Sequence, residues 1–157
     1  MTEEEWVGCT SPEEMLNHLG DRASERKLRL YAINCCRRIW HLLTDDRCRH
    51  AIEVAQRYVD KRATDADLAS AGLVVAASAR LELPGSHMAR STYAPGGAAW
   101  SATRASAWIA AWDSAYDARM AARDFVSDTD WESERLWQAG LLHDLFGNPY
   151  HVVRPEP

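Results

Sequence analysis

Hydrophobic residues recur along most of this chain at the three- and four-residue spacing of a helix, and no stretch keeps the strict alternation of a strand. Between residues 44 and 61, one side of the predicted helix is apolar and the opposite side is charged. The apolar side comprises Cys48, Ala51, Ile52, Ala55, Tyr58 and Val59. A single stripe of this kind is typical of a helix that packs one face on a core. The pattern therefore predicts an all-α protein.

Capping residues mark where the helices should begin and end. Ser, Thr or Asp precedes each apolar-periodic segment, Pro12 occupies a first helical position, and Gly147 supplies a left-handed stop. The predicted helices are 12–20, 24–43, 44–61, 64–83, 98–126 and 129–146. The prolines and glycines of residues 84–97 predict a loop, and the alanine-rich segment after it contains neither residue. We expect one domain over 1–157, a bundle-like or orthogonal arrangement of five to six helices.

The predicted helix 24–43 is apolar on two sides. One side carries Leu28, Tyr31, Cys35, Ile39 and Leu42, and the nearly opposite side carries Leu30, Ile33 and Trp40 among Arg26, Arg29 and Arg37. Such a helix either lies at the centre of its domain or packs one side against a partner. If the second side is exposed, its six residues form the candidate partner-binding surface.

The predicted helix 98–126 has an aromatic and cationic side. Trp100, Arg104, Trp108, Trp112 and Tyr116 recur every four residues, and Arg119 shares their side. Buried against alanines, the tryptophans would be core; left open, Arg104, Trp108, Trp112 and Arg119 would line a groove for an anionic or planar ligand. We expect the opposite side, with Asp113 and Asp117, to be solvated. The predicted core includes Tyr31, Cys35, Ile39, Leu42, Ile52, Ala55, Val59, Trp108, Trp112, Trp137 and Leu141.

Composition and charge narrow the classes of function. Hydrophobic residues make up 46% of the 157 residues and the net charge is −5, which argues for a folded domain and against a typical nucleic-acid binder. The first third nevertheless has a local basic excess, which favours an acidic protein partner over nucleic acid bound through Arg26, Arg29 and Arg37. A homodimer also remains open. No run of about 18 apolar residues and no leader pattern is present, so we expect a cytoplasmic protein and no membrane partner.

No motif for catalysis or metal binding occurs. The four cysteines form neither a CxxC pair nor a disulfide framework, and the six histidines show no ligand spacing. Cys35, Cys36 and His41 are chemically competent, but nothing in the sequence brings a nucleophile to a base. We therefore assign no catalytic residue, metal or cofactor, and an enzyme is the less favoured class.

Two stretches carry a family resemblance. Residues 27–43 (KLRLYAINCCRRIWHLL) with 49–55 (RHAIEVA), together with the ends 2–10 (TEEEWVGCT) and 141–149 (LLHDLFGNP), resemble a group of uncharacterised helical proteins numerous in planctomycetes. More loosely, the helices 24–43, 44–61 and 98–126 are similar to bacterial immunity-protein domains, helical partners proposed to neutralise toxins. The resemblance implies a non-enzymatic protein-interaction module that is immunity-like. The alternative is a small-ligand binder or enzyme that uses the Trp/Arg side, and nucleic-acid binding is the weaker alternative.

Overall fold

The computed structural model describes residues 1–82, 94–125 and 128–151, and this part of the chain is built from helices without a strand. The α-helices are α1 (Glu3–Gly8), α2 (Pro12–Leu19), α3 (Glu25–Arg38), α4 (Asp46–Val59), α5 (Asp65–Glu82), α6 (Ala94–Ala102), α7 (Ala107–Phe125) and α8 (Asp128–Phe146), with 3-10 turns at Gly20–Arg22 and Trp40–Leu42. The all-α class is confirmed. The predicted number of five to six helices is too low, because the described residues form eight.

The predicted caps at both ends of the chain are present. Ser11 Oγ accepts the backbone N–H of Glu14 at 3.4 Å, and Gly147, with φ 64°, donates its N–H to the carbonyl of His143 at 2.8 Å. The short α1 was missed, although Thr2 and Glu5 form a capping box. Its Trp6 is buried and donates its indole N–H to the carbonyl of Gly147 at 3.0 Å, which ties α1 to the end of α8.

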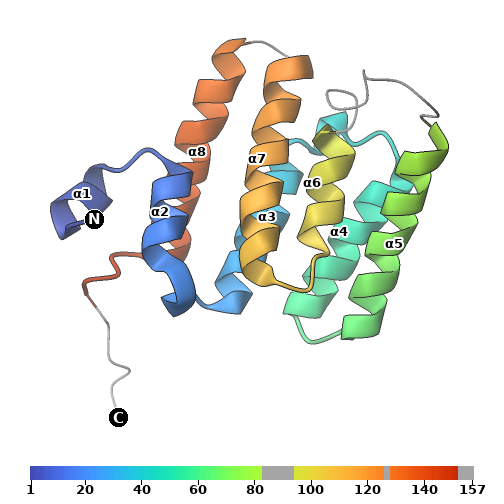
Figure 1. Cartoon of the computed structure of the whole chain (residues 1–157), viewed down its shortest axis with the longest axis horizontal. Helices are drawn as coiled ribbons and strands as arrows, with labels where there is room; N and C mark the ends of the chain where they lie inside the picture. The colour runs from blue at the N-terminus through green and yellow to red at the C-terminus, as the bar shows by residue number, and fades with distance from the viewer. Residues whose placement is uncertain (83–93, 126–127, 152–157) are drawn as a thin grey trace.

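The helices form two layers (Figure 1). In that view α7 and α6 lie in front of α3 and α4, with α5 at one edge and α2 and α8 at the other. Helix α3 packs against α4, α6, α7 and α8, so it is the central helix of the fold. This central position explains why α3 is apolar on two sides.

The long helix predicted over 98–126 is wrong, because the chain breaks between α6 and α7. Thr103 Oγ1 donates to the carbonyl of Trp100 at 2.6 Å, and Ser106 Oγ accepts the N–H of Ile109 at 3.3 Å to cap α7. Hydroxyl side chains that bond nearby backbone groups offer the chain an alternative to the helix. The predicted 84–97 loop lies mostly outside the described residues, but its last four residues belong to α6, where Pro95 falls in the first turn and needs no N–H.

Small residues dominate the centre of the core. Ten alanines of α6 and α7 are buried, among them Ala98, Ala110 and Ala118, each with 0% exposure. Of the predicted core, Tyr31, Cys35, Ile39, Ile52, Ala55 and Val59 are buried, and Leu42, Trp112, Trp137 and Leu141 pack partly buried against them. Trp108 is 38% exposed, so its assignment to the core is wrong. The alanines let α6 and α7 approach closely, and the larger indole ring of Trp108 stays at the surface.

A buried polar network joins α2, α7 and α8. Arg119 donates to Gln138 Oε1 at 2.8 Å and is ion-paired with Glu13. Gln138 donates to Glu134 Oε1 at 3.2 Å and to the carbonyl of Ala115 at 3.0 Å. Burial lowers the pKa of Arg119 to about 10. Because charges are buried only when they are paired, the network fixes which helices meet here.

Candidate functional site

The outward side of α3 is the most consistently charged surface of the described residues. Arg26, Lys27, Arg37 and Arg38 are exposed there, and the only acidic residue of the helix is Glu25 in its first turn. Between the two cationic pairs, Leu30 and Asn34 are half-buried. We call these four cations of α3 and Arg49 of α4 the basic face.

Several cations of the basic face are held over aromatic rings. The guanidinium of Arg49 lies 5.7 Å from the ring centroid of Trp40, and that of Arg38 lies 5.3 Å from Trp137. Lys27 Nζ lies 5.6 Å from the Phe146 ring. Contacts of this kind restrict long side chains before any partner binds, which lowers the entropy cost of binding. The basic face is therefore a partly preorganised surface.

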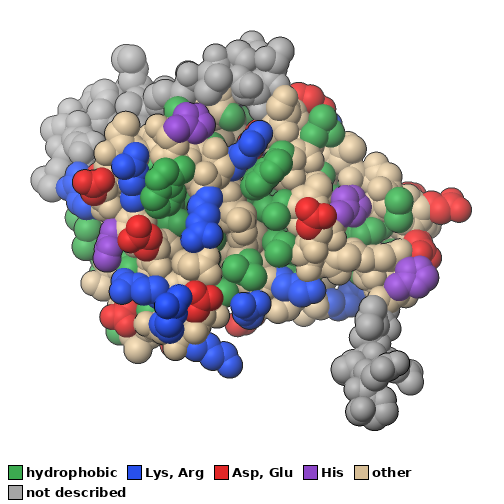
Figure 2. Space-filling model, turned by 180° about the vertical axis from the view of Figure 1, so that it is seen from behind, with side chains coloured by type: hydrophobic (Ala, Val, Ile, Leu, Met, Phe, Trp, Pro, Cys, Tyr) green, Lys and Arg blue, Asp and Glu red, His purple; other side chains and the backbone are tan. Residues whose placement is uncertain are grey.

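The charge of the chain is divided unevenly around this surface. Residues 20–62 contain eleven Lys or Arg and six Asp or Glu, a net of +5, whereas the rest of the chain has a net of −10. Figure 2 shows the side of the molecule behind the view of Figure 1, the side on which α3 and α4 lie. Lys and Arg side chains are numerous on it and hydrophobic side chains lie between them. The protein therefore has a positively charged side although its net charge is negative.

The structure separates the six residues of the predicted partner-binding surface. Arg26 and Arg37 are exposed, Leu30 and Trp40 are half-buried, and Arg29 and Ile33 are buried, Ile33 completely. The expected exposed apolar patch of Leu30, Ile33 and Trp40 does not exist, because α3 is covered on both of its apolar sides. The two exposed arginines, Arg26 and Arg37, belong to the basic face.

Arg29 has a structural position instead. Its guanidinium donates to the carbonyls of Ala102 at 2.9 Å, Arg104 at 2.8 Å and Ala105 at 3.0 Å, and it lies 5.3 Å from the ring centroid of Tyr58. These carbonyls end α6 and begin the turn to α7, where a cation also complements the negative end of the helix dipole. Arg29 thus holds the α6–α7 turn and is not available to a partner.

The alternative ligand site on the Trp/Arg side is not assembled. Arg104 stacks 4.7 Å from the ring centroid of Trp100, while Arg119 is buried in the network with Glu13 and Gln138. Trp108 and Trp112 do form a tilted pair with centroids 5.5 Å apart, and the indole N–H of Trp112 is buried without a partner. Neither cavity described below is lined by any of the four predicted residues. The predicted convergence of these four residues is therefore wrong.

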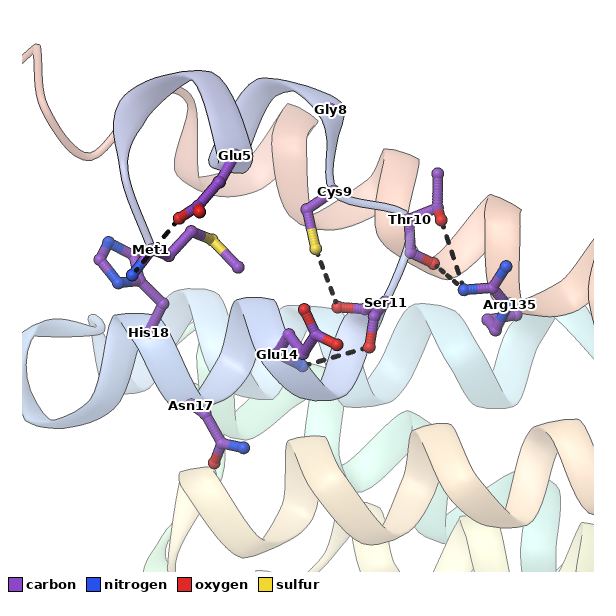
Figure 3. Close-up of a pocket in the computed structure, with 10 residues that line it drawn as sticks. All are labelled: Met1, Glu5, Gly8, Cys9, Thr10, Ser11, Glu14, Asn17, His18 and Arg135. Atoms are coloured by element: carbon purple, nitrogen blue, oxygen red, sulfur yellow. Dashed lines mark hydrogen bonds and ion pairs between the residues drawn. The ribbon is translucent and has the colours of Figure 1, made fainter.

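A cavity of about 880 Å³ lies between α1, α2 and α8 (Figure 3). Cys9 and Glu5 point into it from one side, and Glu14 and His18 line the other. Two of its side chains are engaged in contacts within the protein: Cys9 Sγ donates to the carbonyl of Ser11 at 3.6 Å, and His18 bonds the Tyr150 hydroxyl at 3.1 Å. A ligand pocket of this size is usually lined mostly by apolar groups, and this one is not.

A smaller cavity, about 190 Å³, is a groove between α4 and α5. From α4 it is lined by residues at positions 47, 50, 54 and 57, which share one side of the helix, and from α5 by positions 67, 70, 71 and 74. Arg57 and His50 are exposed at its edge. The groove was not predicted from the sequence, although the spacing of Arg47, His50 and Arg57 on one helix side was a usable signal.

The titratable groups of the interior do not form a catalytic site. Burial raises the pKa of the Cys36 thiol to about 12 and that of Cys35 well above its usual range, so neither supplies a thiolate at neutral pH. Asp117, expected in a solvated face, is half-buried, and burial together with the nearby Asp113 raises its pKa to about 6. Among the described residues no three His, Cys, Asp or Glu side chains are grouped to hold a metal ion.

Two further observations bear on the class of protein. Within the described ranges, no helix combines the length and the apolar character that crossing a membrane requires. Comparisons of the chain with protein families, with curated proteins and with solved structures find no match. The assignment of function therefore depends on the surfaces described above.

Proposed function

We propose that this protein is a non-enzymatic interaction module that binds an acidic protein partner through the basic face. The observation that carries the proposal is the outward side of α3, on which Arg26, Lys27 and Arg37 are exposed. Arg38 is exposed beside them, although its Nε is ion-paired with the buried Glu134 at 3.3 Å. A surface of one sign on a protein of the opposite net charge attracts partners of complementary charge and repels the same surface of another copy. The loose resemblance to immunity-protein domains favours a protein as the partner.

The same surface argues against two other partners. A twofold dimer formed through the basic face would place like charges opposite each other, because an isologous interface uses the same patch twice. Binding of nucleic acid needs an extended positive potential, which the net charge of −10 on the chain outside residues 20–62 opposes. Both remain as outcomes of the experiment below.

The test uses the full chain, immobilised and exposed to lysate from its source cells. The decisive variant is Arg26→Glu/Arg37→Glu, which reverses two charges about 17 Å apart along α3 without touching buried groups. We expect a protein captured by the wild type to be lost at least tenfold from this variant, and its capture to weaken as salt rises. Arg104→Glu is the matched control, since it reverses one cation outside the basic face and also probes the Trp/Arg alternative.

Three results would contradict the proposal. Loss of capture after nuclease treatment would identify nucleic acid, and a concentration-dependent doubling of mass in light scattering, abolished by the double variant, would identify a second copy of this chain. Equal loss from Arg104→Glu and from the double variant would show that the basic face has no special role. Circular dichroism of each variant separates these results from misfolding.

A further inference from the structure

The groove between α4 and α5 combines a positive edge with an apolar floor. Arg57 and His50 are exposed at the edge, the buried Val54 and Ala71 form the floor, and Ser70 and Asp67 are the polar residues that α5 contributes. Arg47 also lines the groove, but its guanidinium is ion-paired with Asp45, which offsets most of its charge, so Arg57 is the main cation of the groove. The groove is next to the positive end of the α5 dipole, which favours an anion further.

The one carboxylate of the groove is already engaged. Asp67 accepts hydrogen bonds from the backbone N–H of Thr64 at 2.8 Å and from its hydroxyl at 2.7 Å, and these bonds lower the pKa of Asp67. Asp67 therefore serves as the cap of α5, and it offsets only part of the positive charge of the lining. An anionic group that enters the groove meets two arginines and one such carboxylate.

The size of the groove decides what kind of ligand fits. Pockets for small molecules and cofactors usually enclose about 300 to 1,000 Å³, and a volume of about 190 Å³ holds a single side chain. The surface beside it is apolar, because Leu73 is 70% exposed and Val74 is 49% exposed. A carboxylate with an apolar neighbour matches this combination, as in an acidic amphipathic peptide.

We infer that the α4–α5 groove holds a Glu or Asp side chain of an acidic, leucine-bearing peptide segment, with Arg57 and His50 on the carboxylate and Leu73 beside an apolar neighbour. The inference rests on the proposed function, since that segment would belong to the acidic partner. The groove would hold one side chain of the partner, whereas the basic face would attract the partner through charge.

The experiment is a titration of the ¹⁵N-labelled full chain with a short synthetic peptide of glutamate and leucine, followed by NMR. We expect saturable shifts of the amides of Ser70 and Val74, and at least tenfold weaker binding to Arg57→Gln and to Leu73→Ser. Arg62→Gln is the matched control: it removes an exposed arginine just beyond the end of α4, paired with Asp60, and should change the affinity less than twofold.

Each other outcome overturns the inference. Equal losses from Arg57→Gln and Arg62→Gln would show diffuse attraction to positive charge, and shifts confined to α3 would place the peptide on the basic face alone. Inorganic phosphate that reproduces the shifts with the same affinity would identify a site for free anions. The proposed function is tested separately: if Arg57→Gln loses the peptide while Arg26→Glu/Arg37→Glu retains the natural partner, the groove stands and the basic-face proposal falls.

Discussion

Replacement of Arg29 by methionine gives the sharpest test of how the fold is held. The change keeps a long apolar stem but removes three hydrogen bonds to carbonyls, of which the one to Ala102 is buried and those to Arg104 and Ala105 are partly buried. A buried acceptor left without a partner costs about 1 to 3 kcal/mol, and each partly hydrated one about 1 kcal/mol. The lost contact with Tyr58 adds about 0.5 kcal/mol.

These contributions predict that Arg29→Met lowers the free energy of unfolding by about 3 to 5 kcal/mol. For a chain of this size the melting temperature should fall by about 6 to 20 °C. Urea denaturation followed by circular dichroism measures the first quantity, and hydrogen exchange should show faster opening of the turn between α6 and α7. Arg37→Met, on the exposed side of the same helix, should change stability by no more than about 0.5 kcal/mol. A loss below about 1 kcal/mol for Arg29→Met would refute the reasoning, because water would then satisfy the carbonyls as well as the guanidinium does.

Three further predictions concern the interior. Burial raises the pKa of Asp117 from 3.8 to about 6, so the folded state favours the protonated carboxyl and stability falls as pH rises between about 4 and 6. Asp117→Asn should remove this loss of stability, which is about 3 kcal/mol at pH 7. Urea unfolding of both proteins across this pH range measures the effect. Gly97→Ala should destabilise by about 1 to 3 kcal/mol in the same assay, because its Cβ would lie 2.8 Å from Asp117 Oδ2, whereas Gly140→Ala, with nothing within 4 Å, should stabilise α8 by about 0.5 to 1 kcal/mol. Iodoacetamide should modify only the half-buried Cys9 of the native protein, and mass spectrometry should find the other three thiols labelled only after unfolding.

Each of these has a result that contradicts it. Parallel pH profiles for wild type and Asp117→Asn would show that the carboxyl is better solvated than its position implies. Equal changes in stability from Gly97→Ala and Gly140→Ala would show that α6 and α7 do not approach each other closely at Gly97. Rapid labelling of Cys35 or Cys36 in the native state would mean that α3 opens locally far more often than the whole protein unfolds.

Local signals in the sequence were sufficient for most helix ends. The caps at Ser11 and Gly147 depend on residues within one turn, and the structure shows both. The break between α6 and α7 has local signals in Thr103 and Ser106, but the carbonyls that it leaves open are bound by Arg29, more than 70 residues away, and no local pattern shows that contact. In contrast, α1 was within reach, since the Thr2–Glu5 capping box is visible in the sequence.

The candidate site shows the same division between local and distant information. The cationic character of residues 22–49 can be read directly from the sequence, and Arg26 and Arg37 are exposed as a surface requires. The exposure of Leu30 and Ile33 depends on how many helices pack against α3. The hydrophobic pattern within a single helix does not reveal how many neighbours it has. The groove between α4 and α5 likewise exists only because two helices face each other, so its members became recognisable as a set only in the structure.

The network of Arg119, Gln138 and Glu134 gives α8 a unique register. An interface rich in alanine tolerates sliding, since small side chains offer nearly the same contacts after a shift of one turn, about 5.4 Å. Such a shift would carry Gln138 away from the carbonyl of Ala115 and remove its hydrogen bond with the buried Arg119, which would keep only its ion pair with Glu13 of α2. Misregistered forms are therefore costly, and the polar groups select one alignment from several that apolar packing alone would permit.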